Sequence, residues 1–136
     1  MKKNVCFYRV IYGDTDQMGV VYYANYLRWF EMGRTELLRQ LGAPYSSIEE
    51  RGLFFPVTEV SSRYLKSARF DDEIAVETYI QEIERATIVF GYRILRKHDG
   101  APLVEGWTRH ACLDRLGKVV RIPGEIDDLL RAAMAD

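Results

Sequence analysis

Histidine and cysteine are scarce in this sequence of 136 residues, and each occurs only twice. Cys6 and Cys112 form no C-x-x-C pair, and neither His98 nor His110 has the companions of a metal site or a catalytic triad. We therefore expect no metal and no cofactor. Two free, buried thiols are the expected state of the cysteines, with a disulfide as the alternative.

Long apolar runs and an excess of one charge are missing as well. The net charge is −1, which argues against nucleic acid or an anionic membrane as the main partner. No segment approaches the roughly 20 apolar residues of a membrane span, and residues 1–5 lack the apolar stretch of a signal peptide. With 48% hydrophobic residues the chain can build one core, so we expect a single cytoplasmic domain over residues 1–136.

One long segment has helical periodicity. From Ala24 to Leu41, apolar residues recur every three to four positions, and Gly42 supplies the stop. Gly33 inside this helix costs about 1 kcal/mol relative to alanine, which indicates that a neighbouring element approaches closely there.

Two short helices are also expected. One covers residues 46–51 with Ser46 or Ser47 as its N-cap, and the other follows Pro123-Gly124 at the end of the chain.

Most of the remaining chain is typical of strands, because it is rich in β-branched and aromatic residues. Asp99-Gly100 is a good hairpin signal between two of these runs. The simplest α+β packing of such elements wraps a curved antiparallel sheet around the long helix and leaves an edge strand open to pairing. The predicted strands cover residues 5–12, 54–68, 73–84, 86–97, 101–114 and 118–122.

The segment between the first strand and the long helix carries the chemistry. Asp14, Asp16 and Gly19 lie there, so a carboxylate can sit beside the electropositive helix start, whose N–H groups bind developing negative charge. This arrangement suits acyl-group hydrolysis, which needs a base or nucleophile beside an oxyanion site. The competing interpretation is a pair of turn acids.

The run from Tyr12 to Glu36 resembles the 4-hydroxybenzoyl-CoA thioesterase-like branch of the hot-dog fold superfamily. The resemblance implies a hot-dog fold and a homodimer or homotetramer, and we expect the substrate site near the subunit boundary. The matching residues are Tyr12, Asp14, Thr15, Asp16, Gly19, Val20, Tyr22, Tyr23, Asn25, Tyr26, Trp29, Phe30, Glu31, Arg34 and Glu36.

The resemblance also implies an activity, namely hydrolysis of an acyl-CoA to a carboxylic acid and CoA. Asp16 then acts as base or nucleophile, and the backbone N–H of Tyr23 holds the oxyanion. Some relatives have histidine at the third position of Val21-Tyr22-Tyr23, and the tyrosine here removes that side-chain acid or base.

Substrate contacts are expected from Gly19, Tyr22 and Arg85. The candidates for binding the phosphates of CoA are Arg85, Arg93, Arg96 and Lys97, and Arg85 lies near the turn where relatives have basic residues. The alternatives are a turn glycine, an interface aromatic residue and a solvated arginine. Asp14 is expected to shape the loop by accepting backbone hydrogen bonds.

Three alternatives stay open at this point. The thioester can be carried by acyl carrier protein instead of CoA, or the chain can be a non-catalytic acyl-thioester binding protein. Glu31 on the long helix is a minor catalytic candidate, and its expected role is pairing with Arg28 or Arg34.

Overall fold

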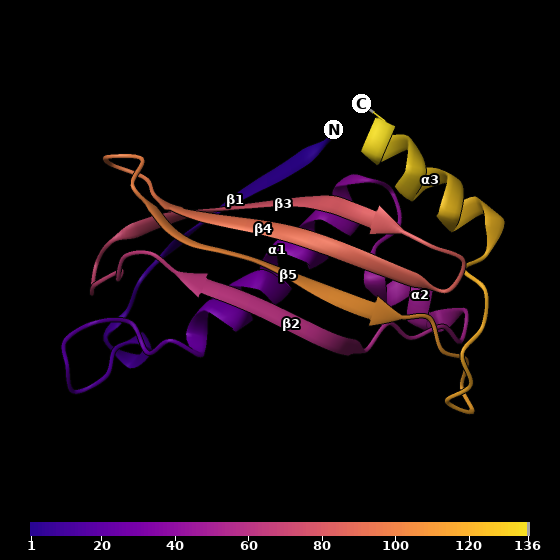
Figure 1. Ribbon diagram of the computed structural model, residues 1–136, viewed down its shortest axis with the longest axis horizontal. Helices are drawn as coiled ribbons and strands as arrows, with labels where there is room; N and C mark the ends of the chain where they lie inside the picture. The colour runs from indigo at the N-terminus through magenta and orange to yellow at the C-terminus, as the bar shows by residue number, and fades with distance from the viewer. Residues whose placement is uncertain (136) are drawn as a thin grey trace.

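Five antiparallel strands form one sheet in the computed structural model, which describes residues 1–135 (Figure 1). Their order across the sheet is β1-β3-β4-β5-β2. The strands are β1 (Lys3–Arg9), β2 (Val57–Tyr64), β3 (Glu73–Ile83), β4 (Thr87–Arg96) and β5 (Pro102–Ala111). The helices are the short 3₁₀ helix η1 (Tyr12–Asp14), α1 (Asn25–Gln40), α2 (Tyr45–Glu50) and α3 (Gly124–Ala135).

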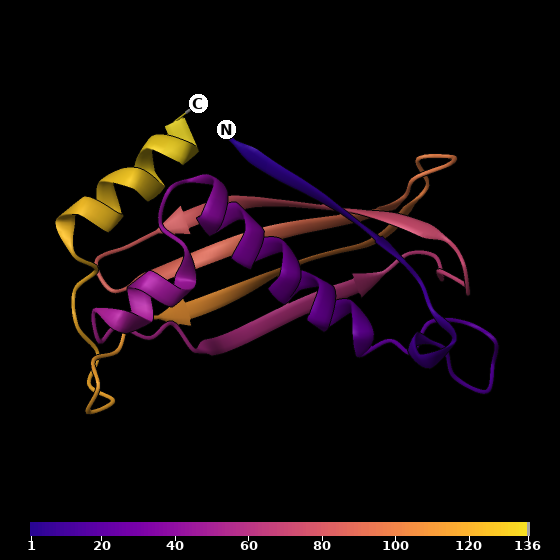
Figure 2. The same cartoon turned by 180° about the vertical axis from the view of Figure 1, so that it is seen from behind.

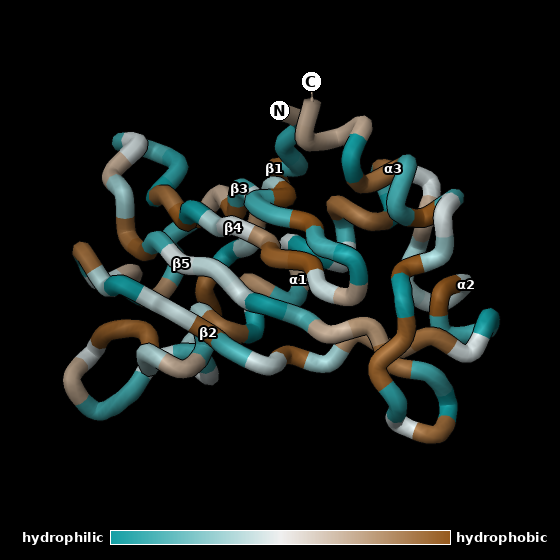
Figure 3. Tube along the Cα trace, turned by 45° about the vertical axis from the view of Figure 1, so that its right-hand side comes forward, coloured by the Kyte–Doolittle hydropathy of each residue, from teal (hydrophilic) through white to brown (hydrophobic). Residues whose placement is uncertain are grey.

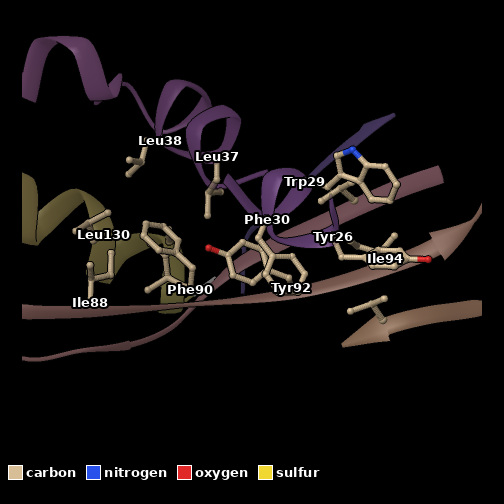
Figure 4. Close-up of a cluster of buried hydrophobic side chains, with 14 of the residues drawn as sticks. Tyr26, Trp29, Phe30, Leu37, Leu38, Ile88, Phe90, Tyr92, Ile94 and Leu130 are labelled. Carbon is tan, nitrogen blue, oxygen red and sulfur yellow. The ribbon is translucent and has the colours of Figure 1, made fainter. Parts of the chain in front are cut away.

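The long helix α1 crosses one face of the sheet and packs on β1, β3 and β4 (Figure 2). Its sheet-facing side chains fill the space between the two layers, and the ring of Phe30 stacks on that of Tyr92 with centroids 4.2 Å apart (Figure 4). The predicted α+β hot-dog fold, a curved sheet around one long helix, is therefore confirmed. The buried residues of α1 are Tyr26, Trp29, Phe30, Gly33, Leu37 and Leu38.

The close approach predicted at Gly33 is also confirmed. A β-carbon at Gly33 would collide with the side-chain hydroxyl of Thr78 and would lie 3.0 Å from a methyl group of Val76. Both contacts come from β3, so glycine lets α1 lie directly against this strand.

Two local predictions were wrong. Residues 118–122 form no strand, since only Val119 makes an isolated bridge, to Leu113, in a tight loop over residues 112–120. The N-cap of α2 is Pro44 rather than Ser46 or Ser47, because the Ser47 hydroxyl donates to the Pro44 carbonyl at 2.7 Å and is not free to cap the helix.

Strand β2 forms an exposed edge of the sheet. Val60 pairs with the buried Thr108 of β5 and so shares its core-facing side, yet Val60 is 49% exposed because α1 does not extend over β2. Hydrophobic positions stand between hydrophilic ones along this strand (Figure 3). In residues 1–135 we find no helix both long and apolar enough to cross a bilayer.

Candidate active site

The acidic segment forms a small hairpin-like loop before α1. Thr15 and Val21 form an antiparallel bridge, and the N–H of Asp16 donates to the Val20 carbonyl at 2.9 Å. Gly19 lies in the tip with φ 79°, a left-handed conformation that glycine adopts at little cost. The turn therefore depends on glycine at this position, while its neighbours present their side chains around it.

Asp14 is buried and holds the base of this loop. Its Oδ2 accepts the Tyr8 hydroxyl at 2.8 Å and the Ile11 N–H at 3.0 Å, and its Oδ1 lies 3.7 Å from the Arg28 guanidinium. These contacts fix the loop against β1 and α1. The loop-shaping role predicted for Asp14 is confirmed.

Asp16 has a different environment from Asp14. Its side chain is half-buried, and Oδ1 accepts the Met18 N–H at 2.9 Å across the loop tip. No donor in residues 1–135 reaches Oδ2. One oxygen thus orients the carboxylate while the other is free to meet a ligand.

Tyr23 presents its backbone N–H just before the first turn of α1. No acceptor in residues 1–135 contacts this N–H, whereas the Tyr23 carbonyl accepts the Tyr64 hydroxyl at 3.2 Å. The positive end of a helix and an unpaired donor together attract negative charge. Tyr23 is 59% exposed, and its ring centroid lies 4.8 Å from that of Tyr22.

The loop brings Asp16 and Tyr23 to one end of the molecule. The Tyr22 N–H donates to the Asp14 carbonyl at 2.8 Å and the Asp16 N–H donates to the Val20 carbonyl at 2.9 Å, so Asp16 and Tyr23 lie on the two paired arms of this loop, three residues apart along the pairing. Gly19 and Tyr22 belong to the same loop. Four of the five predicted site residues therefore lie together.

A cavity of about 350 Å³ lies at the opposite end of β2. Tyr64 ends β2 beside Tyr23, with ring centroids 6.1 Å apart, whereas Val57 begins β2 and lines the cavity. Both ends are visible in Figure 2, with the acidic loop at one side and α2 and α3 at the other. The lining comes mainly from α1, α2, the start of β2, β4 and α3.

Arg85 lies in the β3–β4 turn, at the same end as this cavity. Its backbone carbonyl accepts the Ile122 N–H at 2.9 Å, and its side chain is exposed. Within one chain, the β3–β4 turn that contains Arg85 and the loop before α1 lie at opposite ends of the sheet (Figure 1).

A chain of buried hydrogen bonds runs from α1 across the sheet beneath the cavity. The Tyr92 hydroxyl lies 3.5 Å from the Arg34 guanidinium and 2.6 Å from Thr108 Oγ1, which lies 2.8 Å from His110 Nε2. His110 Nδ1 lies 2.8 Å from the Phe55 carbonyl.

The protonation state of His110 determines which groups donate and which accept in this hydrogen-bond network. Burial lowers the pKa of His110 to about 4, and the positive charge of Arg34 acts in the same sense. The imidazole is thus neutral at pH 7, and Nδ1 must carry the proton because a carbonyl only accepts. Nε2 then accepts from Thr108, and Thr108 accepts from Tyr92.

No pattern in the sequence predicted the cavity or this network. Their residues are scattered over most elements, so no local pattern joins them. The weak signals were a cation, Arg34, on the apolar face of a helix and a histidine, His110, inside a strand.

A curved sheet around one helix, with an acidic loop at the helix start, defines a hot-dog protein of the thioesterase class. Residues 10–132 match the thioesterase-like superfamily. The chain belongs to this family, and the predicted resemblance is confirmed.

Individual relatives agree with this assignment. The chain is 41% identical over 121 residues to the acyl-CoA thioesterase YbgC of Haemophilus influenzae, covering 87% of each chain. A Thermus thermophilus protein of known crystal structure is 37% identical, with a TM-score of 0.90 over 96% of this chain and 97% of that one. The DHNA-CoA thioesterase of Staphylococcus aureus is 27% identical, with a TM-score of 0.93 over 99% and 93%.

Proposed function

We propose that this thioester hydrolase acts on acyl-CoA, with Asp16 and the backbone N–H of Tyr23 as its catalytic groups. The observation that carries the proposal is a half-buried carboxylate with one free oxygen in the same loop as an unpaired N–H at a helix start. The names of relatives such as YbgC support CoA as the thiol.

The reaction has two routes that use the same groups. As a base, Asp16 takes a proton from water while the water oxygen attacks the thioester carbon. As a nucleophile, Asp16 attacks that carbon itself and forms an anhydride that water then cleaves. In both routes the Tyr23 N–H stabilises the oxyanion, the C–S bond breaks, and the sulfur of CoA leaves as a thiolate that gains a proton.

We further infer a homodimer that pairs the two β2 edges about a two-fold axis. Both the open edge and the uncovered Val60 need a partner, and Tyr22 and Tyr23 add exposed aromatic surface nearby. A two-fold axis makes the paired strands antiparallel. The Tyr64 end of one β2 then lies beside the Val57 end of the other.

Such a dimer brings together the acidic loop and the cavity, which lie at opposite ends of a single chain. The Asp16 loop of one subunit meets the cavity and Arg85 of its neighbour, so each active site takes residues from two chains. Arg85 can then bind CoA phosphates next to a loop that its own chain places at the other end. This arrangement supports the phosphate-binding role expected for Arg85.

The activity is tested by steady-state hydrolysis of acyl-CoA esters with aliphatic and aryl acyl groups, beside the matching acyl carrier protein esters. Turnover of CoA esters supports the proposal. Turnover of the carrier-protein esters alone would show that the substrate is an acyl carrier protein ester. A pure, folded dimer that is inactive on every ester would contradict the proposed function.

The shared site is tested by mixing two inactive proteins, one with Asp16→Asn and one with the cavity blocked by Thr35→Trp. Thr35 lines the cavity. After subunit exchange half of the dimers are mixed and each has one intact site, so about a quarter of the wild-type activity should return. No recovery despite mixed dimers would place the whole site within one chain.

A further inference from the structure

The cavity contains a cation whose donors are largely unused. Arg34 is 17% exposed, and its guanidinium contacts only the Tyr92 hydroxyl at 3.5 Å and Glu31 at 3.9 Å among residues 1–135. A guanidinium has five N–H donors. Because Glu31 is 74% exposed, this ion pair is weak and Glu31 can turn towards water.

The other polar side chains that line the cavity belong to Glu31, Thr35, Tyr45 and His110, and none of them is a cation. His110 is neutral and both of its ring nitrogens are engaged, by Thr108 and by the Phe55 carbonyl. Among the lining residues Arg34 is therefore the group with both charge and spare donors. It lies in a cavity whose volume is within the usual range of ligand pockets, about 300–1,000 Å³.

The rest of the lining is suited to a hydrocarbon chain. Aliphatic and aromatic side chains form most of the wall, and Figure 4 labels four of them, Leu38, Ile88, Phe90 and Leu130. An acyl chain that enters here would replace water along its length and would bring its far end into a wall with one poorly paired cation. The apolar lining residues include Leu38, Ile48, Phe55, Ile88, Phe90 and Leu130.

We propose that the cavity binds the acyl group, that the preferred acyl group ends in a carboxylate, and that Arg34 is the residue that selects it. A partly desolvated guanidinium binds a carboxylate through two parallel hydrogen bonds, which neither a methyl group nor a single hydroxyl can reproduce. The inference rests on the proposed thioesterase function, since it identifies the far end of that substrate.

The test measures binding separately from catalysis. Calorimetry compares three thioethers of CoA that cannot be hydrolysed, with hexyl, ω-hydroxyhexyl and ω-carboxyhexyl groups on sulfur. The wild-type protein should bind the carboxylate form at least about tenfold more tightly than the hexyl form, and Arg34→Gln should remove this difference. Glutamine keeps a donor for Tyr92, so the buried network persists.

Arg39→Gln is the matched control, because Arg39 is an exposed arginine of the same helix outside the cavity lining. It should keep the preference for the carboxylate. Equal affinity for the hexyl and carboxyhexyl forms, tighter binding of the hydroxyl form, or a preference that survives Arg34→Gln in a folded protein would overturn the inference.

Hydrolysis of hexanedioyl-CoA and hexanoyl-CoA by the same proteins separates this inference from the proposed function. Arg34→Gln should lower kcat/KM for hexanedioyl-CoA by about tenfold or more and leave hexanoyl-CoA within about threefold. If neither ester is cleaved while the Arg34-dependent binding persists, the thioesterase function fails and the carboxylate site stands.

Discussion

At the scale of single residues, two aspartates two positions apart have opposite environments. Asp14 is buried and accepts hydrogen bonds from Tyr8 and Ile11, whereas Asp16 is half-buried with one oxygen free. A carboxylate whose oxygens are engaged by the protein holds structure, and one with a free oxygen can act on a substrate. One short loop thus contains an acid with a structural role, Asp14, and an acid for which we propose the catalytic role, Asp16.

Asp16→Asn should keep the fold and lower kcat by on the order of 10²–10⁴, because the amide is neither a base nor a nucleophile. Steady-state kinetics with an acyl-CoA ester measure the loss. The exposed Asp128 of α3 supplies the control, and Asp128→Asn should keep full activity. Near-normal turnover by folded Asp16→Asn protein would remove Asp16 from the mechanism.

Asp14→Asn should act mainly on stability and cost activity less than Asp16→Asn. An amide places a donor where Asp14 accepts from Tyr8 and Ile11, so we expect unfolding to become easier by about 1–3 kcal/mol. Urea denaturation measures this. A larger loss of kcat than in Asp16→Asn, at unchanged stability, would reverse the two roles.

Tyr23→Phe should lower kcat/KM by less than about tenfold, which corresponds to under about 1.4 kcal/mol, because the backbone donor remains. The measurement is kcat/KM as a function of pH. A loss of about a hundredfold together with a changed pH profile would show that the hydroxyl itself transfers a proton.

His110 should make the protein sensitive to acid. Its pKa is about 4 when folded and about 6.5 when unfolded, so the unfolded chain binds the proton more readily. The contribution of neutral His110 to stability is complete above pH 6.5 and is lost as the pH falls towards 4, amounting to about 3 kcal/mol.

Chemical denaturation at several pH values checks this prediction. His110→Gln should have a flatter dependence between pH 6.5 and pH 4 than the wild-type protein. His98 is exposed on the β4–β5 hairpin, so His98→Gln should behave like the wild type. Identical slopes for all three proteins would mean that His110 is not the group that titrates.

At the scale of elements, the fit between α1 and β3 depends on the absence of a side chain at Gly33. Gly33→Ala gains about 1 kcal/mol in helix propensity but forces a β-carbon against Thr78 and Val76. We expect a net destabilisation of about 1–3 kcal/mol, as for other overpacked cores. Urea unfolding provides the measurement.

A second substitution identifies the cause. Thr78→Ala removes the hydroxyl that the new β-carbon would meet and should restore part of the stability of Gly33→Ala. Gly124 begins α3, and a β-carbon added there would have no neighbouring atom within 4 Å, so Gly124→Ala should change stability by under about 0.5 kcal/mol. If Gly33→Ala is as stable as the wild type, the helix can shift at no cost.

At the scale of the whole molecule, the open β2 edge and the proposed active site shared by two chains predict that dimerisation and activity are lost together. Val60→Glu should give a monomer and lose thioesterase activity, because it places a charge on the core-facing side of the edge that should pair. Sedimentation and kinetics test both parts. Val5 lies on the opposite edge strand β1 with similar exposure, so Val5→Glu should stay dimeric and active. An active Val60→Glu monomer would contradict the shared site.

The sequence by itself determined the order of the main helices and strands and the position of the acidic loop, while the catalytic role of that loop stays a proposal. Helical periodicity located α1 to within one residue at each end, Gly33 indicated a close contact, and Asp99-Gly100 indicated a hairpin. These features are local, since each depends on residues near one another in the chain. The family was recognisable for the same reason, because its motif is one continuous run. That residues 1–136 form one domain, and that the protein is cytoplasmic, stay predictions.

Tertiary structure alone decided the cavity, the buried network and the separation of Arg85 from Asp16. Arg34, Tyr92 and His110 meet only because α1 crosses the strands that carry the other two. The sequence also predicted a strand at 118–122 that the structure does not contain. Its β-branched residues favour a strand, but a strand forms only where the edge of another strand is free to pair with it. Periodicity records which side of an element is buried, whereas a site between elements depends on distances that only the folded chain sets.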